Sequence, residues 1–378
     1  MPEIFSSIAC NLDSNILSAS LPLFAAEKVQ AIEWSFDTLY NRNDVPDWFN
    51  ELLKAFSDEN RLIGHGVFFS LFSGRWTDEQ QQWLDHLKKL SSQFRFDHIT
   101  EHFGFMTGED FHKGAPISIP FTESTLAIGK DRLKRIQNAC NCPVGLENLA
   151  FSYSLDEVKK NGDFLDQLVE SVNGFILLDL HNLFCQVHNF DISYNDIIQL
   201  YPLDRVREIH ISGGSWENVE VDPVKKIRRD THDDAVPEKV FEFLEKTIPK
   251  CSNLKYVVME QIGSGLDNEE SRVQFQQDFY KMDEIVSLAS KDFKRENKNS
   301  FLPNHPLIAD TVPLEDPFLY AQQQQLSEIL ENVGDYKQAQ FLLQSSTLAH
   351  SSWEVEKWNP AMLETAIAVA QKWKQGFA

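Results

Sequence analysis

The chain of 378 residues is 42% hydrophobic, so it can bury the core of one large domain and still carry an additional segment. Its 57 acidic and 35 basic residues give a formal net charge of -22, which repels phosphate backbones and argues against general nucleic-acid binding. No basic region followed by an apolar stretch opens the sequence and no run of 18 apolar residues occurs, so we expect a soluble, cytoplasmic protein without a membrane segment.

Short apolar runs alternate with longer amphipathic segments up to about residue 290. The runs predict eight strands, at residues 7–12, 31–36, 62–68, 96–103, 143–149, 174–182, 206–212 and 256–262. Between them, Thr77 and Ser154 each precede acidic residues in the way that is typical of a helix start. Strands that alternate with helices pair in parallel, and eight such units favour a (β/α)8 TIM barrel over an open sheet.

The character of the sequence changes after residue 292. Residues 291–300 form a charged, polar linker, and four prolines between 303 and 317 break any long helix. From Leu319 the pattern is helical again, up to a last segment at 362–374. We therefore predict a catalytic metal-binding barrel over residues 1–292, then a linker and helical C-terminal extension over 293–378. The expected role of the extension is docking to a partner or formation of a homodimer.

Metal-ligand side chains recur where the predicted strands end. The active sites of TIM barrels lie at the C-terminal ends of the strands, and six consecutive predicted strands each place a histidine or an acid there. These residues are His65, His102, Glu147, Asp179, His210 and Glu260. The segment after the seventh strand adds Asp230 and His232, which would face the same way if the chain there is extended.

Each of these residues has a structural alternative when it is taken alone. A histidine such as His65 in an apolar strand is more often a hydrogen-bonded core residue than a ligand. Glu260 is harder to explain in this way, because a buried carboxylate without a partner costs several kcal/mol and therefore needs a cation or a proton. Taken together, the eight residues favour a metal site.

Further polar residues near the rim are open to two interpretations. His181 could reach the rim, but Asn182 competes with it, and His188 is either a loop ligand or a surface histidine. His98 lies deeper along its strand and is interpreted as a core residue. Glu33 could help at the rim of the second strand, with only its position to support it.

The mixture of imidazole and carboxylate groups suits iron, zinc or manganese. Five cysteines are scattered, odd in number and without zinc-finger spacing, so we expect reduced thiols and no thiolate ligand. Four imidazoles and four carboxylates are too many for one ion, and carboxylates can bridge. The sequence therefore predicts two or three metal ions.

Seven short motifs carry a resemblance to a known family. They are Gly64-His65-Gly66, Thr100-Glu101-His102, Leu146-Glu147-Asn148, the segments 177–182, 208–214 and 230–233, and Met259-Glu260. In this order and spacing the chain resembles, up to about residue 290, the multinuclear non-haem iron oxidases that include MbnB of methanobactin biosynthesis. The resemblance implies a barrel that holds two or three irons and uses O2 to modify a cysteine of a ribosomally synthesised precursor peptide. It also implies a small partner protein that delivers the peptide.

The same resemblance implies roles for individual residues. His65 and His102 match ligands of one iron, Asp179 and His210 match ligands of the next, and Asp230 and His232 match ligands of the remaining ion. Glu147 and Glu260 match carboxylates that bridge metals, so that Glu147, Asp179 and Glu260 are the catalytic candidates, with Asn182 and His188 as additional ligands.

Two departures from the family pattern stand out. The family often has a histidine where Gly214 stands, and its usual Asn-His-Gly segment is here Val187-His188-Asn189. Both departures predict a substrate pocket that differs from those of characterised members.

Three other functions share this barrel. A trinuclear zinc phosphodiesterase of the endonuclease IV type has a similar succession of ligands, but it has a histidine at the position of Asn182 and needs a basic DNA-binding face. A sugar isomerase of the xylose-isomerase type would hold Mg or Mn in a site richer in oxygen. A binding module that uses metal only for stability is the non-catalytic alternative.

Overall fold

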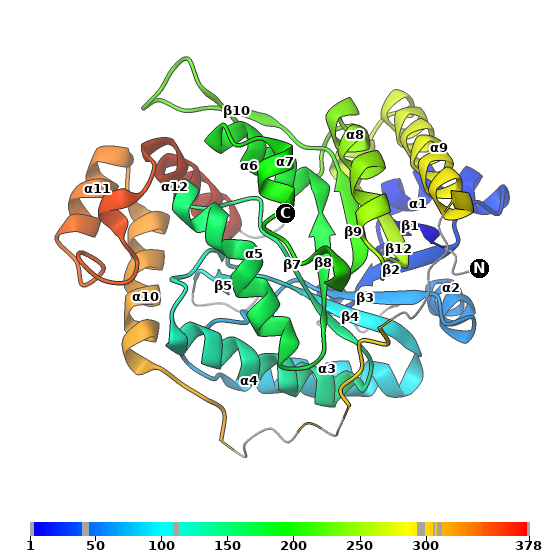
Figure 1. Cartoon of the computed structure of the whole chain (residues 1–378), viewed down its shortest axis with the longest axis horizontal. Coiled ribbons are helices and arrows are strands. Elements are labelled where there is room, and N and C mark those ends of the chain that lie inside the picture. The colour runs from blue at the N-terminus through cyan, green and yellow to red at the C-terminus, as the bar shows by residue number, and fades with distance from the viewer. Residues whose placement is uncertain are drawn as a thin grey trace.

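The structure, a computed structural model, describes residues 4–39, 45–108, 113–292, 299–304, 307 and 312–375. Eight parallel strands close a barrel in the order β1-β12-β9-β8-β7-β4-β3-β2 (Figure 1). The strands are β1 (Phe5–Ala9), β2 (Ala31–Ser35), β3 (Leu62–Gly66), β4 (Phe96–His102), β7 (Val144–Glu147), β8 (Phe175–Asp179), β9 (Val206–Ser212) and β12 (Tyr256–Glu260). The predicted TIM barrel is confirmed.

Helices surround the barrel and continue into the C-terminal extension. They are α1 (Ser14–Ala25), α2 (Asp47–Asp58), α3 (Asp78–Gln93), α4 (Glu123–Cys140), α5 (Leu155–Glu170), α6 (Leu180–Phe190), α7 (Tyr194–Ile198), α8 (Glu238–Thr247), α9 (Glu269–Asp292), α10 (Pro317–Asn332), α11 (Tyr336–Gln344) and α12 (Pro360–Lys374). Two hairpins lie outside the barrel, β5 (Phe105–Met106) with β6 (Pro116–Ile117) and β10 (Trp216–Asn218) with β11 (Lys226–Arg228). None of the described helices is both long and apolar enough to cross a membrane.

The helix starts at Thr77 and Ser154 are confirmed, because both hydroxyls cap the helices that follow them. Several strands end earlier than predicted. The run 174–182 becomes helical at Leu180, since the carboxylate of Asp179 accepts a hydrogen bond from the backbone N–H of Asn182 and so begins α6. Likewise the first strand ends at Ala9, and Asp13 caps α1.

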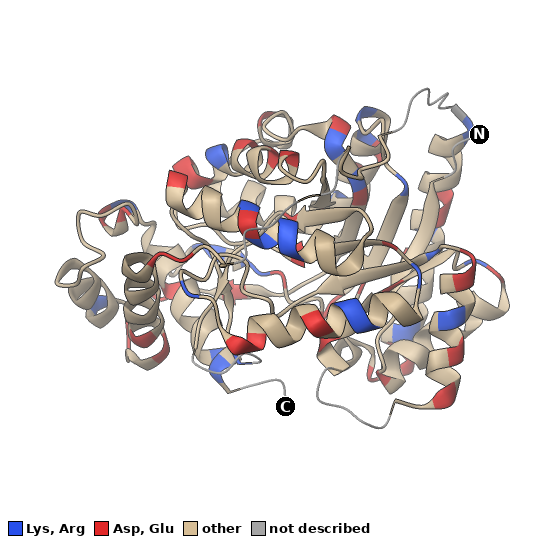
Figure 2. Cartoon of the chain, turned by 90° about the horizontal axis from the view of Figure 1, so that it is seen from below, with Lys and Arg blue, Asp and Glu red and all other residues tan. Residues whose placement is uncertain are grey.

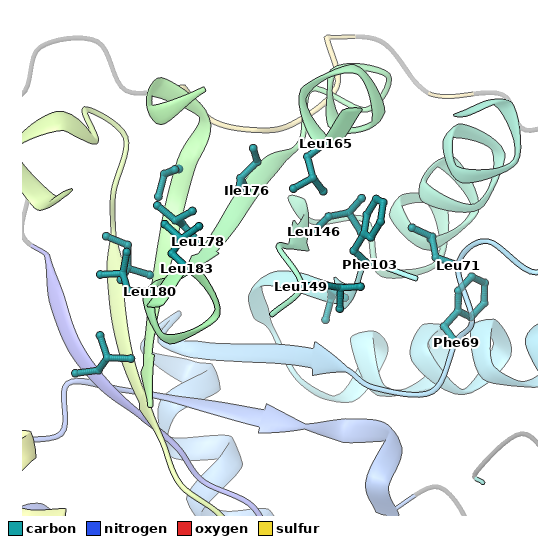
Figure 3. Packing of buried hydrophobic residues seen from close by; sticks show 14 of the residues in the cluster. Phe69, Leu71, Phe103, Leu146, Leu149, Leu165, Ile176, Leu178, Leu180 and Leu183 are labelled. Atoms are coloured by element: carbon teal, nitrogen blue, oxygen red, sulfur yellow. The ribbon is translucent and has the colours of Figure 1, made fainter. Parts of the chain in front are cut away.

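The main hydrophobic core fills the space between the barrel wall and the helices. Figure 3 shows Leu146 and Ile176 of two neighbouring strands beside Leu165 of α5, and all three side chains are fully buried. The strands are buried on both faces, which fits their nearly continuous apolar sequences. This packing holds the strand ends, and hence the predicted ligands, at fixed positions.

The extension packs against the loops at the C-terminal side of the barrel. The ring of Tyr153, in the loop after β7, stacks on Trp358 with centroids 3.7 Å apart. Gln323 of α10 bonds the backbone of the loop after β3, donating to the carbonyl of Phe72 at 2.8 Å and accepting from the N–H of Gly74 at 2.9 Å. The predicted helices are thus present, whereas the boundary between 292 and 293 stays a prediction, and most of the predicted linker and Pro306 lie outside the described residues.

Candidate metal centre

The six residues predicted at strand ends lie on one rim of the barrel. His102, Glu147, Asp179 and Glu260 are the last residues of their strands, and His65 is the last but one in β3. The parallel register places neighbours level with each other, because His102 pairs with Glu147 and Asp179 pairs with His210. The barrel therefore brings these side chains together as predicted.

The first ligand group consists of His65, His102 and Glu147, whose nitrogen and oxygen atoms lie within 4.8 Å of one another. The Nε2 atoms of the two histidines are 3.1 Å apart, and Oε2 of Glu147 lies 3.3 Å from Nε2 of His102. Nδ1 of His65 lies 2.8 Å from the hydroxyl of Thr100, which itself donates to the carbonyl of Gly64. Nδ1 therefore donates, and Nε2 of His65 presents its lone pair to the group.

Two further groups overlap with the first. Glu33, His210 and Glu260 form one of them, with Glu33 and Glu260 each 3.1 Å from a different ring nitrogen of His210. Glu147, Asp179 and His210 form the other. Glu147 and His210 thus each belong to two groups. A carboxylate can bridge two cations, so this overlap suits neighbouring ions rather than isolated ones.

Asp230 and His232 reach the same rim from the segment that follows β11. Nε2 of His232 lies 2.9 Å from Oδ1 of Asp230 and 3.8 Å from Oε2 of Glu260. The segment is not extended at His232, which adopts a left-handed φ of 53° and whose carbonyl accepts a hydrogen bond from the N–H of Ile262. Both side chains converge nonetheless. The side chains of His232 and His102 are 25% and 23% exposed, so solvent reaches the centre on this side.

Asn182 lies beside the carboxylates, at the start of α6. Its amide N–H donates to Glu147 at 3.0 Å and to the carbonyl of Asn148 at 2.8 Å. Its oxygen Oδ1 is buried without a hydrogen-bond partner in the described part of the chain, as are Oδ2 of Asp179 and Oε1 of Glu33. Buried acceptors without donors are costly, and cations would satisfy them.

The prediction that His188 is a ligand is not supported. His188 lies on α6, two turns beyond the start of the helix, and not in a loop. Its Nε2 lies 2.9 Å from the carbonyl of Lys226, and its ring packs at a steep angle to that of Trp216 with centroids 4.5 Å apart. The helix carries the side chain toward the β10-β11 hairpin, and His188 belongs to none of the three ligand groups found in the described residues.

The electrostatics of the rim favour bound cations. Burial raises the pKa of Glu33 to about 8, and burial together with the charge of Asp230 raises that of Asp179 to about 8. Burial and Asp179 also hold the pKa of Glu147 well above its ordinary value. For His65 the pKa lies well below the usual range because of burial and the neighbouring His102. Cations would offset both effects, since they favour ionised carboxylates and neutral imidazoles. The residues present therefore fit a multinuclear metal centre.

Two residues near the candidate centre, Glu33 and Arg228, were given little or no role from the sequence. Glu33 carries the same signal as Glu260, a buried acid within an apolar strand, and the structure places both on His210. Arg228 gave no signal, yet it contacts His181, which in turn contacts Asp230. His98 is a core residue as expected, held between Asp97 and Glu208.

Comparison with known proteins decides the family. The family model for the RiPP precursor modification enzymes MbnB/TglH/ChrH matches residues 29–262, more than half of the chain. The chain belongs to this family. The matched residues include every member of the three ligand groups, and they extend through Asp230 and His232.

Three individual proteins that resemble the chain share between 15% and 28% of their residues with it over the parts that align. A UPF0276 protein of Acaryochloris marina is 28% identical over 188 residues, which cover 48% of this chain and 66% of that protein. Another, from Alcanivorax borkumensis, is 24% identical over 197 residues, with 51% and 63% covered. The chain thus spans somewhat less than two thirds of these relatives. A xylose isomerase-like TIM barrel/4-hydroxyphenylpyruvate dioxygenase fusion protein has a TM-score of 0.49 at 15% identity, covering 74% of this chain and 42% of that one.

Proposed function

We propose that the chain is an O2-dependent multinuclear non-haem iron oxidase that modifies a cysteine of a ribosomally synthesised precursor peptide. Membership of a family of precursor-modifying enzymes supports the peptide as substrate. The observation that carries the proposal is the sharing of Glu147 and His210 between ligand groups, which suits two or three neighbouring ions at one rim.

The chain's own residues would divide the ions among them. His65 and His102 with Glu147 would hold one ion, and His210 with Glu33 and Glu260 a second, for which Glu147 and Asp179 are further ligands. Where a third ion is present, Asp230 and His232 would hold it. Bound ferrous ions would supply the one-electron chemistry that O2 requires and a Lewis acid for the substrate thiolate.

The catalytic carboxylates in this proposal are Glu147, Asp179 and Glu260, which balance the charge of adjacent ions. Asn182 orients Glu147 through its amide N–H and offers its oxygen to the centre. Access past His102 and His232 would let a peptide side chain approach from solvent, while Glu33 and Asp179 lie buried behind them.

Charge favours a peptide over DNA as substrate. Figure 2 shows Lys and Arg interspersed with Asp and Glu along the helices, and the net charge of -22 opposes a phosphate backbone. This argues against the phosphodiesterase alternative. A peptide-delivering partner protein and a homodimer stay predictions.

The test is O2 uptake by protein loaded anaerobically with Fe(II), with the change in mass of a cysteine-containing precursor peptide measured in parallel. We expect O2 uptake that tracks the mass change and disappears when the peptide cysteine is replaced by serine. Protein that retains only zinc and takes up no O2 would contradict the proposal. Cleavage of abasic DNA by the zinc-loaded protein would favour the phosphodiesterase instead.

A further inference from the structure

A chain of hydrogen bonds runs from the β10-β11 hairpin to the candidate metal ligand Asp230. Nε of Arg228 lies 3.1 Å from Nε2 of His181, and Nδ1 of His181 lies 2.8 Å from Oδ1 of Asp230. His181 is fully buried and Arg228 is 3% exposed. Neither residue belongs to the three ligand groups. His181 lies on α6 and Arg228 on β11, so neither comes from a strand of the barrel.

The chemistry of the three side chains allows one direction for each of these two hydrogen bonds. A guanidinium group only donates, so Nε2 of His181 must accept from Arg228. The proton of the neutral imidazole then lies on Nδ1, which donates to the carboxylate of Asp230. Arg228 thereby selects the tautomer that allows His181 to hold Asp230.

Arg228 is itself held on several sides. Its backbone N–H donates to Oδ1 of Asn189 at 2.9 Å, and its carbonyl accepts from the Asn189 amide at 3.0 Å. The guanidinium lies 5.5 Å from the ring centroid of Phe184 and 5.1 Å from that of Trp216. These contacts fix the position from which Arg228 reaches His181.

Gly214 packs closely against the ring of His181. A Cβ added to Gly214 would lie 2.9 Å from Cε1 of the His181 ring and 2.2 Å from the carbonyl oxygen of Arg229. Oδ1 of Asp230 also accepts a hydrogen bond from the hydroxyl of Ser212 at 3.3 Å. The Asp230 carboxylate is therefore oriented from two directions, with Oδ1 2.9 Å from Nε2 of His232.

We propose that His181 and Arg228 are positioning residues of the metal centre, which orient Asp230 for the ion that it shares with His232. The inference rests on the proposed metal centre, but not on the reaction performed there. Groups that orient metal ligands in this way typically contribute 10–100-fold to metal affinity.

The experiment titrates metal-free protein with Fe(II) under anaerobic conditions, and separately with Zn(II), and measures stoichiometry and affinity. His181→Phe removes both ring nitrogens, and Arg228→Met removes the donor but keeps the apolar stem. We expect each to weaken one ion by about 10–100-fold while the remaining ions bind as before. His181→Asn keeps a donor near the position of Nδ1, so it should recover most of the lost affinity.

His188→Phe is the matched control, because His188 lies on the same helix and faces the same hairpin without touching Asp230. It should bind metal like the wild type. Thermal unfolding of the metal-free variants separates a loss of folding from a loss of one ion. Wild-type affinity in His181→Phe and Arg228→Met, or an equal loss in His188→Phe, would overturn the inference.

The Zn(II) titration distinguishes this inference from the proposed function. If the protein never consumes O2 but His181→Phe selectively weakens one zinc ion, the positioning role holds and the oxidase proposal fails. If the protein oxidises its peptide and His181→Phe keeps full affinity for every ion, only the positioning role fails.

Discussion

At the scale of single residues, Glu147 is the carboxylate that belongs to two ligand groups of the candidate metal centre. It belongs to the group with His65 and His102 and also to the group with Asp179 and His210, and Asn182 orients it. Among the described residues, Glu33 belongs to one ligand group. A residue shared between two groups influences more than one ion, so the two carboxylates should differ in the consequences of their removal.

We expect Glu147→Gln to lower the number of bound ions by more than one, and Glu33→Gln to lower it by at most one. The reason is that Glu147 contributes to two overlapping groups. Metal content after equilibrium dialysis measures the difference. Glu157→Gln is a suitable control, since Glu157 is a half-buried acid after β7 that contacts Ser118 and Tyr153 instead of the centre. Equal losses in Glu147→Gln and Glu33→Gln would contradict the shared role.

Glu157 also gives a prediction of pH dependence that does not involve metal. Burial raises its pKa to about 7, from an ordinary value of 4.5. The folded state therefore holds a proton that the unfolded state has lost, and this group makes the protein less stable as pH rises from about 4.5 to about 7. Because Glu157 is half-buried and partly screened by solvent, the loss between pH 5 and pH 8 should be at most roughly 2–3 kcal/mol.

Urea unfolding of metal-free wild type and Glu157→Gln at several pH values measures this effect. The variant should lack the part of the decrease in unfolding free energy that Glu157 causes. The variant should therefore become more stable relative to the wild type as pH rises. Parallel pH profiles for the two proteins would show that Glu157 is ionised without cost in the folded state.

At the scale of elements, the C-terminal extension is packed as part of the barrel's rim. Met362 of α12 clusters with Val219 and Ile227 around the β10-β11 hairpin, and Glu364 accepts hydrogen bonds from the backbone there. Trp358 stacks on Tyr153, six residues after Glu147. The extension therefore holds the loop after β7 and the β10-β11 hairpin, which lie next to the candidate metal centre.

We expect Trp358→Ala to destabilise the whole protein by about 3–5 kcal/mol, because Trp358 is 9% exposed and its ring covers Tyr153. The barrel and the extension share one core cluster, so both should unfold in a single transition. Urea unfolding followed by circular dichroism and by tryptophan fluorescence measures both points. Phe341→Ala on α11, where the side chain is 68% exposed, should change stability by less than about 0.5 kcal/mol. Two separate transitions would show that the extension is an independent unit.

At the scale of the whole molecule, the sequence predicts what depends on regular strand geometry. Strand ends of a TIM barrel meet at one rim, so His102, Glu147, Asp179 and Glu260 could be placed together from their positions alone. Contacts between distant segments could not be predicted. Arg228 and His181 are 47 residues apart, and no local pattern joins them.

The position of His188, away from the ligand groups, has a similar explanation. The apolar run 174–182 does not show where the strand becomes a helix, and that point decides which way the following side chains face. With α6 beginning at Leu180, Asn182 faces Glu147 and His188 faces the hairpin two turns later. Glu33 could have been included on the same grounds as Glu260, whereas the packing of the extension on Tyr153 follows only from the three-dimensional structure.

Removal of metal should weaken the folded state without abolishing it. Without metal, the candidate centre holds several buried carboxylates, and burial opposes their ionisation. It raises the pKa of Glu33 and of Asp179 to about 8. An ion that binds the folded state and not the unfolded state adds about 4 kcal/mol to the free energy of unfolding when its free concentration is about 1,000 times the Kd. The large core between strands and helices lies apart from the ligands, so the barrel should remain folded after chelation. Circular dichroism before and after chelation, with thermal unfolding of both samples, measures this. Glu147→Gln, with fewer ions to lose, should show a smaller drop in unfolding temperature, and an equal drop would place the stabilising ions elsewhere in the molecule.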